Sequence, residues 1–107
     1  MKISEFDTIV SAEQLTLVEF YATWCGACRA MDNILERIAL AMSDMVSVKR
    51  INITLPINRK IVRRYNILSV PTFILFQSGE PLWRGSGIIA FDRFCNIIRR
   101  HQGIYTF

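Results

Sequence analysis

The stretch EFYATWCGACRAM, residues 19–31, places Cys25 and Cys28 three positions apart, directly behind Trp24. Two cysteines at this spacing can bind a metal, close a structural bridge or exchange electrons with another protein. The residues before the pair, TLVEFYA (16–22), are rich in β-forming side chains and apolar on both faces apart from Glu19. This pattern predicts a central strand that is covered by helices on both sides.

The residues after the pair predict a helix, because apolar side chains recur there at steps of three and four: Met31, Ile34, Leu35, Ile38 and Met42. Gly26 is expected to let the chain turn into this helix. The first N–H groups of a helix lack partners within it and, with the helix dipole, favour an anion such as a Cys25 thiolate. Arg29 adds positive charge, and one helical turn brings Cys28 within disulfide reach. This arrangement favours thiol–disulfide exchange, in which Cys25 attacks and Cys28 resolves.

A metal site would need further ligands, and the other candidates are Cys95 and His101. They lie six positions apart in a predicted helix, about 240° around its axis, so they face different directions. The sequence has no second C-x-x-C that could complete a zinc site. A purely structural bridge is disfavoured because a reducing cytoplasm would open it. We therefore predict a redox role for the pair and no bound metal.

The rest of the chain alternates helical and strand patterns. Residues 4–12 predict a short helix with Ser4 as its N-cap, and VSVKRINI (46–53) predicts a second strand. Pro56 is expected to open a short helix, and TFILF (72–76) predicts a strand that turns at 78–80 into an antiparallel partner at PLWRG (81–85). The last helix is marked by apolar positions and a possible stop: Phe91, Phe94, Cys95, Ile98 and Gly103. This order predicts one α/β domain over residues 1–107, mostly parallel at first and ending in a hairpin.

Composition excludes several classes of protein. Of the 107 residues, 51% are hydrophobic and 21% charged, which is typical of neither a disordered chain nor a coiled coil. No apolar run reaches the length of a membrane-spanning helix, and the start MKISEFDTIV has no signal-peptide pattern, so we expect a cytoplasmic protein. The net charge of +4 comes partly from NRKIVRR (58–64) and from Arg99 and Arg100. These are expected to be solvated helix faces, and neither nucleic acid nor membrane is expected as a partner.

The motif WCGAC resembles the active-site motif of the thioredoxin family, and the resemblance continues along the chain. LVEFYATWCGAC (17–28), VKRINI (48–53), YNILSVPTFILF (65–76) and SGE (78–80) with Gly87 match the family in order, over residues 6 to 104. The resemblance implies a thioredoxin fold with a central mixed sheet. Four strands are expected, because few residues precede Ser4 where the family has its first strand. It also implies a protein-disulfide reductase without a bound cofactor, acting on disulfide-containing proteins, recharged by an NADPH-dependent reductase, and monomeric.

The resemblance also implies roles for individual residues. Cys25 is the exposed attacking thiol, and Glu19 stands where the family has a buried acid that exchanges protons with the resolving thiol. Burial of Glu19 would raise its pKa. Arg50 aligns with a basic residue beside that acid, although a solvated strand-end role is equally open. Substrate contacts are expected from residues around the pair, with Pro71 in a cis peptide and the Val70 backbone free to pair with substrate: Trp24, Gly26, Ala27, Val70, Pro71 and Gly87.

One departure from the family leaves alternatives open. Ala27 stands where thioredoxins usually have proline, which restores a backbone N–H and changes the relative stability of the dithiol and disulfide forms. An oxidase or isomerase therefore competes with the reductase. A redox-incidental interaction module is the alternative from another class. Cys95 is expected to be a buried, inert thiol.

Overall fold

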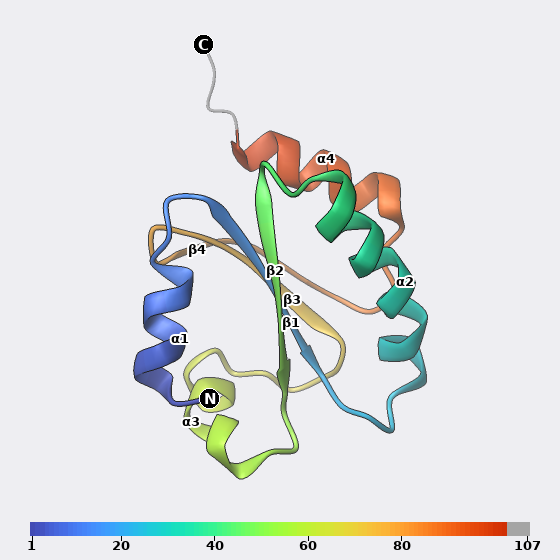
Figure 1. The fold of residues 1–107 in the computed structure, drawn as a ribbon. Coiled ribbons are helices and arrows are strands. Elements are labelled where there is room, and N and C mark those ends of the chain that lie inside the picture. The colour runs from blue at the N-terminus through green and yellow to red at the C-terminus, as the bar shows by residue number, and fades with distance from the viewer. Residues whose placement is uncertain (103–107) are drawn as a thin grey trace.

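The computed structural model describes residues 1–102, so the predicted stop at Gly103 and the tail that follows lie outside the described part. Helices and strands follow one another in the predicted order (Figure 1). They are α1 (Ile3–Val10), β1 (Leu15–Tyr21), α2 (Gly26–Ala41), β2 (Val46–Asn52), the 3₁₀ helix η1 (Pro56–Asn58), α3 (Arg59–Arg64), β3 (Thr72–Gln77), β4 (Glu80–Ser86) and α4 (Phe91–Gln102).

The strands form one sheet in the order β2-β1-β3-β4, a four-stranded mixed sheet, as predicted. β1 is central and pairs in parallel with β2, which lies at one edge of the sheet. The pair β3–β4 is antiparallel, which confirms the predicted hairpin. The pair β1–β3 is also antiparallel, so the expectation of a mostly parallel arrangement before the hairpin is wrong for this pair. The hairpin between β3 and β4 turns through Ser78 and Gly79, at φ angles of 50° and 84°. A two-residue turn with both angles positive matches the right-handed twist of the strands.

Helices cover both faces of the sheet, with α2 and α4 on one side and α1 and α3 on the other (Figure 1). Because side chains alternate along a strand, Leu17 packs into the core under α2 and α4, whereas Val18 packs into the core under α1 and α3. Cys95 belongs to the α2–α4 core and is buried, as predicted. Glu19 follows Leu17 on that same face, which places its carboxylate beneath α2.

The start of α1 differs from the prediction. The helix begins at Ile3 with Lys2 as N-cap, rather than after Ser4. The side chain of Glu5 reaches back, and its Oε1 accepts a hydrogen bond of 3.0 Å from the Lys2 N–H. A glutamate at the third helical position thus satisfies a donor at the helix start, where the prediction had relied on a serine cap. Pro56 was placed correctly, because η1 begins with it.

The basic clusters lie on exposed helix faces, as predicted. They are Arg59, Lys60, Arg63 and Arg64 on α3, and Arg99 and Arg100 on α4. Within residues 1–102, no helix combines the length and apolar character that crossing a bilayer requires.

Candidate functional site

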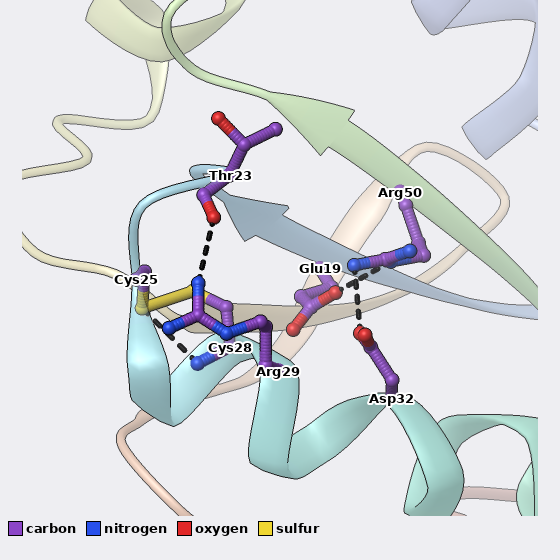
Figure 2. A network of polar contacts seen from close by, with 7 residues as sticks. All are labelled: Glu19, Thr23, Cys25, Cys28, Arg29, Asp32 and Arg50. Atoms are coloured by element: carbon purple, nitrogen blue, oxygen red, sulfur yellow. Dashed lines mark hydrogen bonds and ion pairs between the residues drawn. A yellow bond between two sulfur atoms is a disulfide. The ribbon is translucent and has the colours of Figure 1, made fainter.

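Cys25 and Cys28 lie at the start of α2 and are joined by a disulfide (Figure 2). Cys25 is the N-cap, with an extended backbone, and Cys28 lies in the first turn, 5.2 Å away between Cα atoms. The backbone N–H of Cys28 donates a hydrogen bond of 3.1 Å to the Sγ of Cys25. At most N-caps, a side-chain oxygen accepts a hydrogen bond from a backbone N–H of the first turn; here the Cys25 sulfur accepts it. This hydrogen bond stabilises negative charge on the sulfur.

The two cysteines differ in exposure. Cys25 is 7% exposed and Cys28 is 1% exposed, so Cys25 is the more accessible of the two. The expectation of an exposed Cys25 is nevertheless wrong, because its side chain is buried. Its side chain packs in a small apolar cluster with Ala22 and Cys28, against partly buried Ala27 and Val70. Trp24 beside the pair is 68% exposed, which is consistent with the predicted docking surface and excludes a core role.

The loop before β3 also reaches the pair. The Val70–Pro71 peptide bond is cis, as predicted, and the Val70 carbonyl oxygen lies 3.7 Å from the Cys25 Sγ. Gly87 donates its backbone N–H to the Pro71 carbonyl at 3.0 Å and has a φ of 84°. This left-handed conformation favours glycine at position 87. The structure therefore brings three of the predicted substrate-contacting residues, Val70, Pro71 and Gly87, together in and beside the loop before β3.

Gly26 and Arg29 occupy the first turn of α2. Gly26 does not have a positive φ, and a Cβ built on it would meet nothing closer than the Arg29 Nη2 at 3.9 Å. The turn into α2 at Gly26 therefore uses a backbone conformation that other residues can also adopt. The Nη1 of Arg29 donates to the Thr23 carbonyl at 2.8 Å, which holds its positive charge beside the helix start (Figure 2).

Glu19 lies in the middle of β1 and is completely buried, which excludes an outward position at a sheet edge. Its Oε1 accepts a hydrogen bond of 2.8 Å from the Nε of Arg50, the residue paired with it in register on β2. Its Oε2 is buried and has no hydrogen-bond partner within residues 1–102. Burial raises the pKa of Glu19 above its ordinary value of 4.5, and the hydrogen bond and charge of Arg50 lower the pKa by less.

Arg50 is the centre of a polar network that also includes Asp32, a residue not identified from the sequence. Its Nη2 donates to the Asp32 Oδ1 at 2.9 Å, and its Cζ lies 4.1 Å from the ring centroid of Tyr21. The open question about Arg50 is thus answered, since it contacts the buried acid. Asp32 lies four residues after Cys28 in α2, on the same helix face, and this spacing could have identified it from the sequence.

An open cavity lies beside this network. It has a volume of about 300 Å³, and its lining includes Cys28, Arg29, Asp32 and Arg50. The cavity therefore reaches Cys28 from the side of the charged network. Among residues 1–102, no group of three His, Cys, Asp or Glu side chains is placed to hold a metal ion. His101, considered above as a ligand, contacts the Ile97 carbonyl through Nδ1 at 2.8 Å.

Comparisons with known proteins agree with this geometry. A thioredoxin from Chlamydia pneumoniae is 38% identical over 96 residues, covering 90% of each chain. A bifunctional thioredoxin reductase/thioredoxin from Mycobacterium leprae is 36% identical over 81 residues, or 76% of this chain and 17% of that protein. The chain also spans less than two thirds of Thioredoxin-T from Drosophila melanogaster, 60% of its length at 33% identity. Among solved structures, a mutant thioredoxin from Halobacterium salinarum superposes with a TM-score of 0.82 at 27% identity, covering 95% of this chain and 87% of that one.

The family model named Thioredoxin matches residues 1–100, nearly the whole described chain. The family model, the relatives and the cysteine pair at the start of α2 agree with one another. The chain therefore belongs to the thioredoxin family.

Proposed function

We propose that this protein reduces disulfides in other proteins, with Cys25 as the attacking thiol and Cys28 as the resolving thiol. The observation that carries the proposal is the hydrogen bond from the Cys28 N–H to the Cys25 Sγ at the start of α2. It stabilises a Cys25 thiolate, which is the nucleophile of thiol–disulfide exchange. Cys28 is nearly inaccessible, which suits a thiol that reacts only within the protein.

The reaction proceeds in two exchanges. The Cys25 thiolate attacks one sulfur of the target disulfide, the target S–S bond breaks, and its second sulfur leaves as a thiolate that takes up a proton. Cys28 then loses its proton and attacks the Cys25 Sγ, which releases the target's first sulfur. The target gains two electrons and two protons, and the Cys25–Cys28 disulfide is formed. Glu19 is the proposed acceptor of the Cys28 proton, because its Oε2 is the buried carboxylate oxygen that Arg50 leaves free.

Substitution of each cysteine tests this assignment. We expect Cys25→Ser to abolish reduction of a disulfide protein such as insulin, and Cys28→Ser to accumulate a covalent mixed disulfide at Cys25, visible by mass spectrometry. Cys95→Ala is the matched control, since Cys95 lies in the α2–α4 core and its substitution is expected to leave the rate unchanged. Full turnover by the Cys28→Ser variant would show that the two-cysteine mechanism is wrong.

The proposal includes partners and location. The Mycobacterium leprae relative is named for a reductase and a thioredoxin in one protein, which supports recharging by an NADPH-dependent reductase. We propose that this protein works as a cytoplasmic monomer on disulfide-containing proteins, with no bound cofactor and with neither nucleic acid nor membrane as a partner. The test is NADPH oxidation by a thioredoxin reductase in the presence of insulin, which should depend on this protein. An unchanged rate of NADPH oxidation would contradict the partnership.

A second candidate function follows from Ala27. It occupies the second helical position of α2, between Gly26 and Cys28, where the family usually has proline. For a two-electron couple, about 30 mV of reduction potential corresponds to roughly 1.4 kcal/mol between the dithiol and disulfide forms, so a change in this turn can alter the direction of exchange. Equilibration with glutathione separates the candidates. A potential well below that of glutathione supports the reductase, and one near it or above supports an oxidase or isomerase.

A further inference from the structure

Three charged side chains from three elements, Asp32, Arg50 and Glu19, are linked by hydrogen bonds into one network. Asp32 from α2 accepts a hydrogen bond from the Nη2 of Arg50, and the Nε of Arg50 donates to Glu19. Figure 2 shows this order, with Arg50 between the two carboxylates and the second oxygen of Glu19 pointing away from Arg50, toward the side of the cysteine pair. Arg50 thus contacts one acid that is fully buried and one that is partly exposed.

Arg50 requires an anchor if it is to remain on Glu19. Its side chain is 41% exposed, as is that of Asp32, so water competes for the guanidinium. An arginine side chain has many rotamers, and holding it in one of them costs conformational entropy. The Tyr21 ring covers one face of the guanidinium, and Asp32 binds its outer nitrogen. These two contacts leave Nε directed at the Oε1 of Glu19.

We propose that Asp32 is a positioning residue for the resolving step: it holds Arg50 on the Oε1 of Glu19, so that the Oε2 is left to take the proton of Cys28. The inference rests on the proposed function, in which Cys28 must lose a proton before it attacks the Cys25 Sγ. The proton moves from the Cys28 sulfur to the Glu19 carboxylate, and the Cys28 thiolate then forms the disulfide while the bond from Cys25 to the target sulfur breaks. The leaving sulfur takes up a proton.

Asp32 acts on Glu19 in two opposite ways. Its own negative charge raises the pKa of Glu19, whereas the arginine that it anchors lowers that pKa through a direct hydrogen bond and a positive charge. The contact with Arg50 is the stronger influence, because it is a short charge-assisted bond to a buried group. The groups on this face that bear on Glu19 are Arg50 on β2, Asp32 and Cys28 on α2, and Tyr21 on β1, with uncharged Phe73 opposite on β3.

Two substitutions separate the anchor from the charge. Asp32→Asn removes the negative charge but keeps an oxygen that can accept from the Arg50 Nη2, whereas Asp32→Ala removes both. Glu36→Ala is the matched control, since Glu36 is exposed one turn further along the same face of α2 and lines a shared open cavity with Asp32. It removes an equal charge without removing the anchor. Arg50→Lys serves as a second variant, because a single ammonium cannot reproduce the two-sided guanidinium contact.

The measurement isolates the resolving step. Reduced protein is mixed in a stopped-flow instrument with 5,5′-dithiobis(2-nitrobenzoate), whose coloured thiol is released once when Cys25 attacks and again when Cys28 resolves. We expect D32A to raise the apparent pKa of the second phase by about one unit. At pH values below that pKa, the second phase should then be slower by up to about tenfold, with the first phase unchanged. R50K should also raise the apparent pKa of the second phase, whereas D32N and E36A should leave that pKa unchanged or lower it.

Each other result overturns the proposal. An unchanged or lowered apparent pKa in D32A shows that Asp32 does not anchor Arg50. Equal upward shifts in D32A, D32N and E36A also overturn the proposal, because loss of a negative charge lowers the pKa of Glu19 and D32N and E36A keep the anchor. Thermal unfolding confirms that each variant is folded. If the unsubstituted protein releases no second thiol, the proposed two-cysteine function itself has failed. If it releases both and D32A behaves identically, only the positioning role has failed.

Discussion

Glu19 is an acidic residue inside a buried strand, where most strands have no charge. The guanidinium of Arg50 offsets only part of the free-energy cost of burying its carboxylate. An unpaired buried carboxylate is strongly unfavourable, and Arg50 contacts just one of its two oxygens. The pKa of Glu19 is therefore raised above 4.5, chiefly by burial. A carboxyl group with a raised pKa is poised to gain and lose protons nearer neutral pH, as the resolving step requires.

The raised pKa predicts a specific dependence of stability on pH. Between 4.5 and its folded-state pKa, Glu19 is protonated in the folded chain and ionised in the unfolded chain. The folded state thus binds more protons, so the free energy of unfolding falls as pH rises through this window. We expect Glu19→Gln to remove this fall, which amounts to about 1.4 kcal/mol for each unit by which the pKa is raised.

Urea unfolding at about pH 5 and about pH 8 measures this difference, with the exposed Glu36→Gln as control. The control should keep the pH dependence of the unsubstituted protein. An identical pH dependence in the unsubstituted protein and the Glu19 variant would contradict a raised pKa.

Prediction from sequence differed among the residues of this network. Glu19 could be recognised because a charge within an apolar strand is conspicuous, and its burial is confirmed. Arg50 stayed undecided because the pattern of a strand does not say which partner it pairs with, or in what register. The spacing of Asp32 from Cys28 places it on the same helix face, but its contact with Arg50 could not be predicted, because the position of Arg50 follows only from the pairing of β1 with β2.

At the scale of elements, α2 carries the chemistry, since Cys25 caps it and Cys28 lies in its first turn. The stripe of apolar residues predicted this helix, and burial of Met31, Leu35 and Ile38 confirms it. The start of α1 was harder to predict, because both a serine and a glutamate near a helix start can satisfy its free donors. Strand direction was also only partly predictable, as β1 pairs with one parallel and one antiparallel neighbour.

Ala27→Pro tests the first turn of α2. Proline is tolerated there because the N–H groups of this turn have no intrahelical acceptor, and it restricts the unfolded chain. We therefore expect the free energy of unfolding of the reduced protein to rise by about 0.4–1 kcal/mol. Ala39→Pro, the same substitution at an exposed site inside α2, should instead lower it by about 3 kcal/mol or more. A loss of stability in the Ala27 variant would mean that the first turn cannot adopt the backbone that proline requires.

The whole molecule is a sheet between two helical layers, and each layer has its own core. The α2–α4 core includes Phe94 among its fully buried side chains. The Phe94 ring lies 4.9 Å from that of Phe73 and 6.0 Å from that of Trp83, between centroids and both edge-on. Such pairs add stabilisation beyond the burial of their area.

Phe94→Ala should therefore be among the most damaging core substitutions. Phe94 is fully buried, so we expect its truncation to lower the free energy of unfolding by about 3–5 kcal/mol, a large part of the total of about 5–15 kcal/mol for a domain. Phe94→Leu, which leaves a smaller void, should cost clearly less. Urea unfolding measures both variants, and equal losses would show that the ring is not packed as described.

The register of β2 against β1 has a consequence for the whole protein. Glu19 and Arg50 meet because they are paired across these strands, with both side chains directed toward α2. Since side chains alternate along a strand, sliding β2 by a single residue would turn Arg50 to the opposite face and present Lys49 or Ile51 to the buried carboxylate. The pH profile of the second exchange therefore reports whether the edge strand β2 has paired in the correct register. A chain with β2 misaligned would show a slow second exchange even while most of its core remained packed.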